Sequence, residues 1–88
     1  KKWDGVWRIV FFDIPTSNHW KRGALREQLH ILNFYQLPKS VWVHPFDCEE
    51  IVTLIKSEHR LGQAMLYIIA DVVENDGALR KHFNLRHA

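Results

Sequence analysis

The alternation of hydrophobic and polar positions predicts strands and helices along the whole chain. Residues 6–14 are dense in β-branched and aromatic side chains, and the run ends at Pro15, which cannot donate a hydrogen bond to a neighbouring strand. This run predicts a central strand. The Thr-Ser-Asn sequence at 16–18 is typical of a helix start. An amphipathic helix is expected to follow, because apolar residues recur at helical spacing at Trp20, Ala24, Leu25, Leu29 and Leu32.

The middle of the chain predicts two short strands and a second helix. Residues 34–37 and 40–43 are β-prone runs separated by a turn signal, so they predict a second and a third strand. Asp47 is followed three places later by Glu50, which resembles the capping box that opens many helices. A second helix is therefore expected from this point to about Arg60.

The last third of the chain holds one more strand and a helical tail. Leu61-Gly62 is expected to end the second helix, because glycine readily adopts the left-handed conformation of a helix C-terminus. Residues 64–73 form a nearly continuous apolar run, which predicts a buried fourth strand. After Asn75 apolar residues return at roughly helical spacing, and they predict a short C-terminal helical segment.

The order strand, helix, strand, strand, helix, strand predicts an α+β, ferredoxin-like βαββαβ fold. In this fold an antiparallel sheet carries both helices on one face, and the other face stays open. The first strand has large apolar groups on both faces, since Trp7, Ile9 and Phe11 alternate with Arg8, Val10 and Phe12. An exposed apolar sheet face usually marks an interface.

Composition restricts the class of protein. With 88 residues, 47% of them hydrophobic, the chain can bury one modest core, and dimerisation is one way to support so small a domain. Twelve Lys and Arg against ten Asp and Glu give a net charge of +2, so any phosphate-binding surface requires local clustering. Cys48 is the only cysteine, which excludes an intrachain disulfide, and no run is long enough to span a membrane. A cytoplasmic protein is expected.

Several motifs resemble one known family. The opening KWDGVWRIVFFDIP at 2–15, the segment FYQLPKSVWV at 34–43, DCEE at 47–50 and LRKHF at 79–83 look like the Cas-two-like domain of PaaX-type transcriptional repressors. The matches follow the right order and cover nearly the whole chain. The resemblance implies the same ferredoxin-like fold and a place in the superfamily of the CRISPR-associated endonuclease Cas-two.

The resemblance to the nuclease rests on Asp13, at the end of the first strand, and on Ser40-Val41-Trp42. It implies a homodimer in which two copies of this aspartate face each other and hold Mg²⁺ or Mn²⁺. The WDG opening and Pro38, where the nuclease family usually has glutamine, depart from that pattern.

PaaX-type regulators usually carry a winged-helix DNA-binding domain ahead of this module, and no part of the sequence resembles one. The resemblance therefore implies that residues 1–88 are a single Cas-two-like domain. The favoured interpretation is a fragment of a longer protein with an N-terminal winged-helix domain, and the alternative is a free-standing relative.

Asp13 is the strongest candidate for a catalytic, metal-binding residue. A carboxylate near a symmetry axis could share a divalent metal with its mate and leave open positions for water and phosphate. The structural alternative is a hydrogen bond from the following turn, as aspartate commonly makes. Asp71, at the end of the fourth strand, is considered as a second carboxylate near Asp13, although such a residue more often simply closes a strand.

Other candidates concern binding. Lys21, Arg22, Arg26 and Lys39 are candidates for contact with the phosphates of DNA or RNA, against the alternative of an ordinary solvated helix face. Cys48 falls in a predicted first helical turn, where the helix dipole could lower its pKa, but it is interpreted as structural. Trp3, Trp7 and Trp42 are candidates for an interface, with packing inside the domain as the alternative for the first two.

The sequence thus favours a Cas-two-like dimerisation and interaction module of a PaaX-type regulator, which requires no cofactor. The first alternative is a free-standing, metal-dependent Cas-two-type endonuclease or spacer-acquisition subunit with Asp13 as catalytic and metal-binding residue. The second alternative is a non-catalytic nucleic-acid-binding scaffold. A homodimer without membrane contact is the expected assembly.

Overall fold

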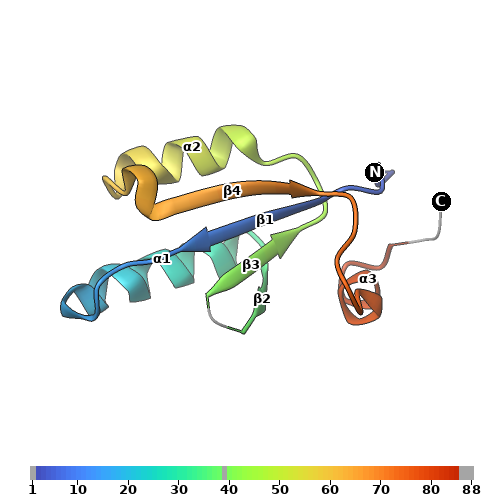
Figure 1. The fold of residues 1–88 in the computed structure, drawn as a ribbon, viewed down its shortest axis with the longest axis horizontal. Helices are drawn as coiled ribbons and strands as arrows, with labels where there is room; N and C mark the ends of the chain where they lie inside the picture. The colour runs from blue at the N-terminus through green and yellow to red at the C-terminus, as the bar shows by residue number, and fades with distance from the viewer. Residues whose placement is uncertain (1, 39, 86–88) are drawn as a thin grey trace.

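The apolar runs of the sequence form a sheet and helices in the expected order, in a computed structural model that describes residues 2–38 and 40–85 (Figure 1). The strands are β1 (Trp7–Phe12), β2 (Tyr35–Leu37), β3 (Val41–His44) and β4 (Met65–Ala70). The helices are α1 (His19–Ile31), α2 (Glu49–Glu58) and α3 (Gly77–His82), and short 3-10 turns occupy Thr16–Asn18 and Gly62–Ala64.

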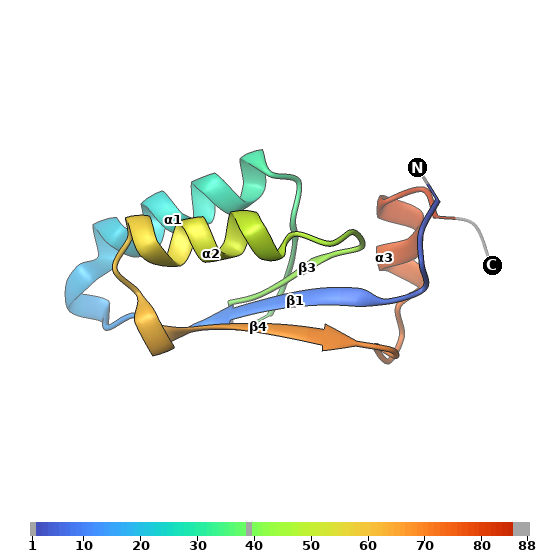
Figure 2. The ribbon, with the colours of Figure 1, turned by 90° about the horizontal axis from the view of Figure 1, so that it is seen from above.

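The four strands form one antiparallel sheet in the order β2-β3-β1-β4. The strand β1 lies inside the sheet, paired with β3 on one side and with β4 on the other. Both α1 and α2 lie over the same face (Figure 2). The expected α+β, ferredoxin-like βαββαβ fold is therefore confirmed.

The main core lies between this face and the two helices. Alternate strand residues point toward the helices, because successive side chains of a strand lie on opposite faces. The residues at the centre of this core are at most 3% exposed: Val10, Phe12, Trp42 and Met65 from the strands, Leu25 and Leu29 from α1, and Val52 and Ile55 from α2.

Trp20 does not belong to the buried side of α1, in contrast to the expectation from its spacing. Its side chain is 70% exposed, whereas Leu25 and Leu29 are fully buried. A helix turns by about 100° per residue, which places Trp20 roughly 140° round the helix from Leu25. The apolar side of α1 is therefore narrower than the sequence pattern indicates.

A second, smaller cluster covers one end of the opposite face. Trp7 and Val43, which point away from α1 and α2, pack against Leu79 of α3 and against Trp3. Leu79 is 2% exposed, and Phe83 packs at the edge of the same cluster. The short α3 thus lies at the end of the sheet where the N-terminal segment enters (Figure 1).

The helix ends differ in detail from the predicted caps. Neither Asn18 before α1 nor Cys48 before α2 makes a capping hydrogen bond through its side chain. The expected capping box does not form, because the Asp47 carboxylate accepts a hydrogen bond from the Glu49 N–H, at 3.1 Å, two residues ahead. At the other end of α2 it is Arg60, with φ 53°, that takes the left-handed conformation expected of Gly62. Gly62 also has positive φ, but it begins the next 3-10 turn.

Candidate association surface

The face of the sheet turned away from α1 and α2 presents two rows of apolar side chains. One row runs across all four strands, through Leu37, Val41, Phe11 and Leu66, and these residues are direct partners in the register. In the next row Ile9 pairs with Ile68. We call these six residues the open face.

The open face is only partly covered by the chain itself. Leu66 is 52% exposed, Ile68 42% and Phe11 37%, and the other three members are half-buried. Strand β4 is an edge strand with one exposed side, so the expectation of a buried fourth strand is wrong. Adjacent, exposed apolar side chains in a sheet are typical of a contact surface.

Sequence reasoning did not name Leu66 and Ile68. The run at 64–73 is apolar at nearly every position, and this pattern predicts burial on both faces. The usable signal was the element order, because two helices can cover only one face of the sheet. Alternate residues of the last strand must then point to the uncovered side.

Trp3 and Trp7 are buried within the chain. The exposed fractions are 8% for Trp3 and 0% for Trp7, and the two ring centroids are 4.6 Å apart. The Trp7 indole N–H donates to the Asp76 carboxylate at 3.2 Å, and the Arg80 guanidinium lies 4.9 Å from the centroid of the Trp3 ring. These contacts join the N-terminal segment to α3, as the alternative of packing inside the domain predicts.

Trp42 belongs to the other face. It is fully buried beneath α1, where its ring makes an edge contact with His30 at a centroid distance of 4.8 Å. Its indole N–H has no hydrogen-bond partner among the described residues. Trp42 therefore contributes to the core and does not border the open face.

The WDG opening holds the start of β1 through an ion pair. The guanidinium of Arg8 donates to both carboxylate oxygens of Asp4, at 2.9 and 2.8 Å, and to the backbone carbonyls of Val6 and Pro45, each at 2.9 Å. The hydrogen bond from Arg8 lowers the pKa of Asp4 to about 2 and raises the pKa of Arg8 itself. Gly5, with φ 84°, makes the turn that brings the two side chains together.

Asp13 lies exposed directly after β1, and its backbone N–H donates to the Ala64 carbonyl at 2.9 Å. Within residues 2–38 and 40–85, no three His, Cys, Asp or Glu side chains gather as a metal-binding group.

Asp71 does not lie near Asp13. Because β1 and β4 are antiparallel, the end of β1 meets the start of β4, where Phe12 pairs with Met65. Asp71 follows Ala70, which pairs with Trp7 at the opposite end of β1. The suggested second carboxylate is therefore separated from Asp13 by the length of a six-residue strand, roughly 20 Å.

The basic candidates of α1 do not form one patch. The helical turn of about 100° per residue puts Arg22 about 100° and Arg26 about 140° round the helix from Lys21. The buried residues Leu25, at about 40°, and Leu29, at about 80°, lie between Lys21 and the two arginines. Lys39, the fourth candidate, lies outside the described residues.

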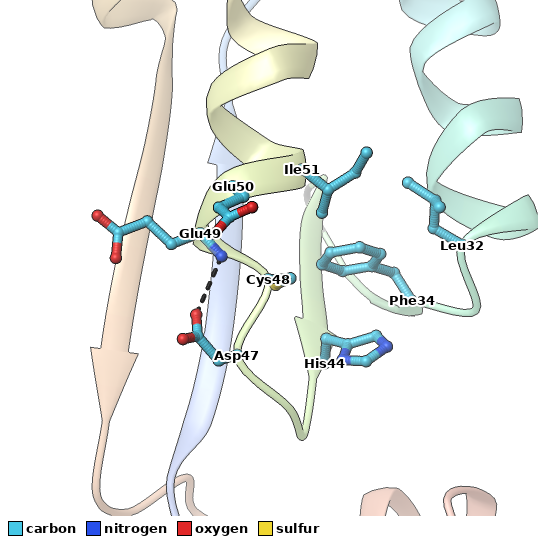
Figure 3. A pocket seen from close by; sticks show the side chains of 8 residues that line it. All are labelled: Leu32, Phe34, His44, Asp47, Cys48, Glu49, Glu50 and Ile51. Atoms are coloured by element: carbon cyan, nitrogen blue, oxygen red, sulfur yellow. Dashed lines mark hydrogen bonds between the residues drawn. The ribbon is translucent and has the colours of Figure 1, made fainter.

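A hollow of about 380 Å³ lies between the C-terminal end of α1, the end of β3 and the start of α2 (Figure 3). Leu32, Phe34 and Ile51 give it an apolar side, and His44, Cys48 and three carboxylates line the remainder. Burial raises the pKa of the Cys48 thiol, contrary to the lowering expected from the helix dipole. The thiol is therefore protonated at neutral pH, which favours the structural interpretation.

The Tyr67 hydroxyl supports the loop in front of α2. It accepts a hydrogen bond from the Cys48 backbone N–H at 3.3 Å, and burial raises the pKa of Tyr67 to about 12. A neutral tyrosine and a neutral thiol thus face each other beneath the start of α2.

These observations define a class: a ferredoxin-like α+β domain whose helices cover one sheet face and whose other face exposes a band of apolar side chains. Comparison with family descriptions agrees with this class, since the family described as PaaX protein central Cas2-like domain matches residues 1–82. The chain belongs to this family.

No curated protein matches the chain. In the part of the chain that the structure describes, no helix is long and apolar enough to cross a membrane.

Proposed function

We propose that this chain is the association module of a PaaX-type transcriptional regulator and that it pairs with a second copy through the open face. The observation that carries the proposal is the exposure of Phe11, Leu66 and Ile68 side by side on β1 and β4. Family membership supports the regulator class. In this proposal DNA recognition belongs to a separate winged-helix domain, and the module requires no cofactor.

The energetics favour association through the whole row across the sheet. Completing the burial of one half-exposed Leu, Ile or Phe contributes about 1 kcal/mol, because full burial contributes about 1.5–3 kcal/mol. Three such side chains on each of two copies contribute about 6 kcal/mol, which reaches only the lower part of an association cost of about 4–15 kcal/mol. The dimer is therefore expected to bury Leu37 and Val41 as well, on both copies.

A pair of matched variants tests this proposal. Leu66→Glu places a charge on the open face, and Leu54→Glu places the same charge on α2, at a side chain that is also 52% exposed. Light scattering after size-exclusion chromatography is expected to give a dimer for the wild type and for Leu54→Glu, and a monomer for Leu66→Glu.

The expected difference arises because a carboxylate buried between two apolar faces loses its hydration without gaining a partner. Circular dichroism checks that both variants keep the fold. Dimers of equal stability for Leu66→Glu and the wild type would exclude the open face as the interface.

A further inference from the structure

A second hollow, of about 320 Å³, opens between the start of α1 and the end of α2. Asn18, Trp20 and Lys21 line it from one side, and Glu58, His59 and Arg60 from the other. Both helix ends lie at the end of the molecule opposite the chain termini (Figure 1). The volume falls at the lower end of the range of about 300–1,000 Å³ that small-molecule sites occupy.

Trp20 gives this hollow an exposed aromatic side chain. Of the four tryptophans, the other three are at most 8% exposed, whereas Trp20 is 70% exposed and packs in neither core cluster. Large aromatic side chains contribute most when they are covered. An indole at the rim of a hollow therefore offers a flat surface on which another ring can stack.

Two cationic side chains, Lys21 and Arg60, line the same hollow as this indole. Among the described residues neither Lys21 nor Arg60 takes part in an ion pair. Glu58 is the carboxylate that lines the same hollow, so the cations exceed the anions by one. His59 is held in place by a contact of 2.9 Å between its Nε2 and the Gln28 side-chain oxygen. The charge of the hollow is complementary to a single phosphate.

Arg60 occupies a backbone position at which glycine is more stable. Its φ is 53°, and the N–H of the next residue, Leu61, bonds back to the Lys56 carbonyl to close the helix end. This conformation is unfavourable for a residue with a side chain. The Arg60 side chain can therefore be removed by a change to glycine without loss of the helix end.

We propose that this hollow binds a nucleotide, with the base stacked on Trp20 and the phosphate held by Lys21 and Arg60. The same chemistry is supplied by a free mononucleotide or by one nucleotide of a single-stranded nucleic acid. A paired base is a poorer ligand, because its faces are already stacked within the duplex. The site lies on the helix side of the sheet, so its occupation is separable from pairing through the open face.

The test uses the full chain and three probes: AMP, a fluorescein-labelled oligothymidine, and the same oligothymidine annealed to its complement. Amide and indole NMR spectra follow AMP, and fluorescence anisotropy follows the two oligonucleotides. The Trp20 indole signal is expected to shift, while those of the three buried tryptophans stay in place. Trp20→Ala is expected to weaken binding roughly tenfold or more, as loss of one stacked base does.

Variants that change one charge in the hollow test whether the ligand carries a negative charge. Lys21→Gln and Arg60→Gly are each expected to weaken binding about threefold or more, and Glu58→Gln is expected to strengthen it. Lys81→Gln on α3 and Ile31→Ala at the far end of α1 are matched controls, because both side chains are exposed and lie outside the hollow. Thermal melting is expected to show intact folds, since Trp20 is exposed and glycine suits position 60.

Each outcome decides the proposal. Binding of AMP with a shift at Trp20 supports a mononucleotide, and binding of the single strand without AMP supports a nucleic-acid source. The proposal is overturned if neither ligand binds, if Trp20→Ala changes affinity by less than about twofold, or if the duplex binds as well as the single strand.

Discussion

Replacing Arg8 by methionine removes the buried guanidinium that ties the N-terminal segment to the loop before α2. The Arg8 side chain is 10% exposed and its two terminal nitrogens make four hydrogen bonds, while Nε has no hydrogen-bond partner within residues 2–38 and 40–85. Methionine has a similar length and no donors, so the change deletes the hydrogen bonds with little change in packing.

The loss of stability depends on which hydrogen-bond acceptors remain without a donor after the replacement. The Asp4 side chain is 55% exposed and is hydrated again when Arg8 is lost, so Asp4 contributes little to the loss of stability. The Pro45 carbonyl, whose bond to Arg8 is buried, loses its donor, and such a group costs about 1–3 kcal/mol. The free energy of unfolding is therefore expected to fall by about 2 kcal/mol, which lowers Tm by roughly 10 °C for a domain of this size.

Urea unfolding followed by circular dichroism measures this change, with Arg8→Lys as the control. Lysine keeps the charge but not the planar fork that binds both Asp4 oxygens, so it is expected to fall between methionine and the wild type. A methionine variant as stable as the wild type would refute the reasoning, because it would show that the desolvation cost of Arg8 fully offsets the bonds it makes.

Two further changes test the ends of the sheet. The pKa of Asp4 is about 2 in the fold against 3.8 as the ordinary value, so its charge stabilises the protein above pH 4 and this contribution disappears as the pH falls through 2. Asp4→Asn is therefore expected to be less stable than the wild type at pH 7, with a difference that closes between about pH 4 and pH 2 in urea titrations; a difference constant over that range would contradict the assignment. Leu79→Ala removes the main side chain by which α3 packs on Trp7 and is expected to cost about 2–5 kcal/mol. Hydrogen exchange should then show faster exchange in Gly77–His82, and unchanged protection would contradict the role of Leu79.

The element order was predictable because burial of one side gives apolar residues a different spacing along a strand than along a helix. The period of two in β1 and the helical spacing of Leu25 and Leu29 are both consequences of covering one sheet face. The short C-terminal helix followed from the same spacing around Leu79. These features depend on which residues are apolar, and the sequence contains that information.

The details at helix ends were not predictable from residue type alone. Asp47 has the chemistry of a cap, but Cys48 is the N-cap residue of α2, and the Asp47 carboxylate accepts a hydrogen bond from the Glu49 N–H. Arg60 takes the left-handed position although the neighbouring Gly62 is the better candidate by type. Competition between adjacent residues decides such cases, and it depends on backbone geometry.

The candidate sites depended even more on tertiary structure. Spacing along α1 grouped Lys21 with Arg22 and Arg26, whereas the fold puts Lys21 beside Arg60, thirty-nine positions later. Trp42 has the side chain of an interface residue, but its pairing with Val10 puts it beneath the helices. Leu66 and Ile68 are exposed because they lie on the sheet face that the two helices leave uncovered.

Sedimentation equilibrium over a range of protein concentrations tests the central claim, association through the open face, most directly. The proposal predicts that the apparent mass rises from the 10.5 kDa of one chain to twice that value and that Leu66→Glu abolishes the rise. A mass of one chain at every concentration for the wild type would contradict the proposal.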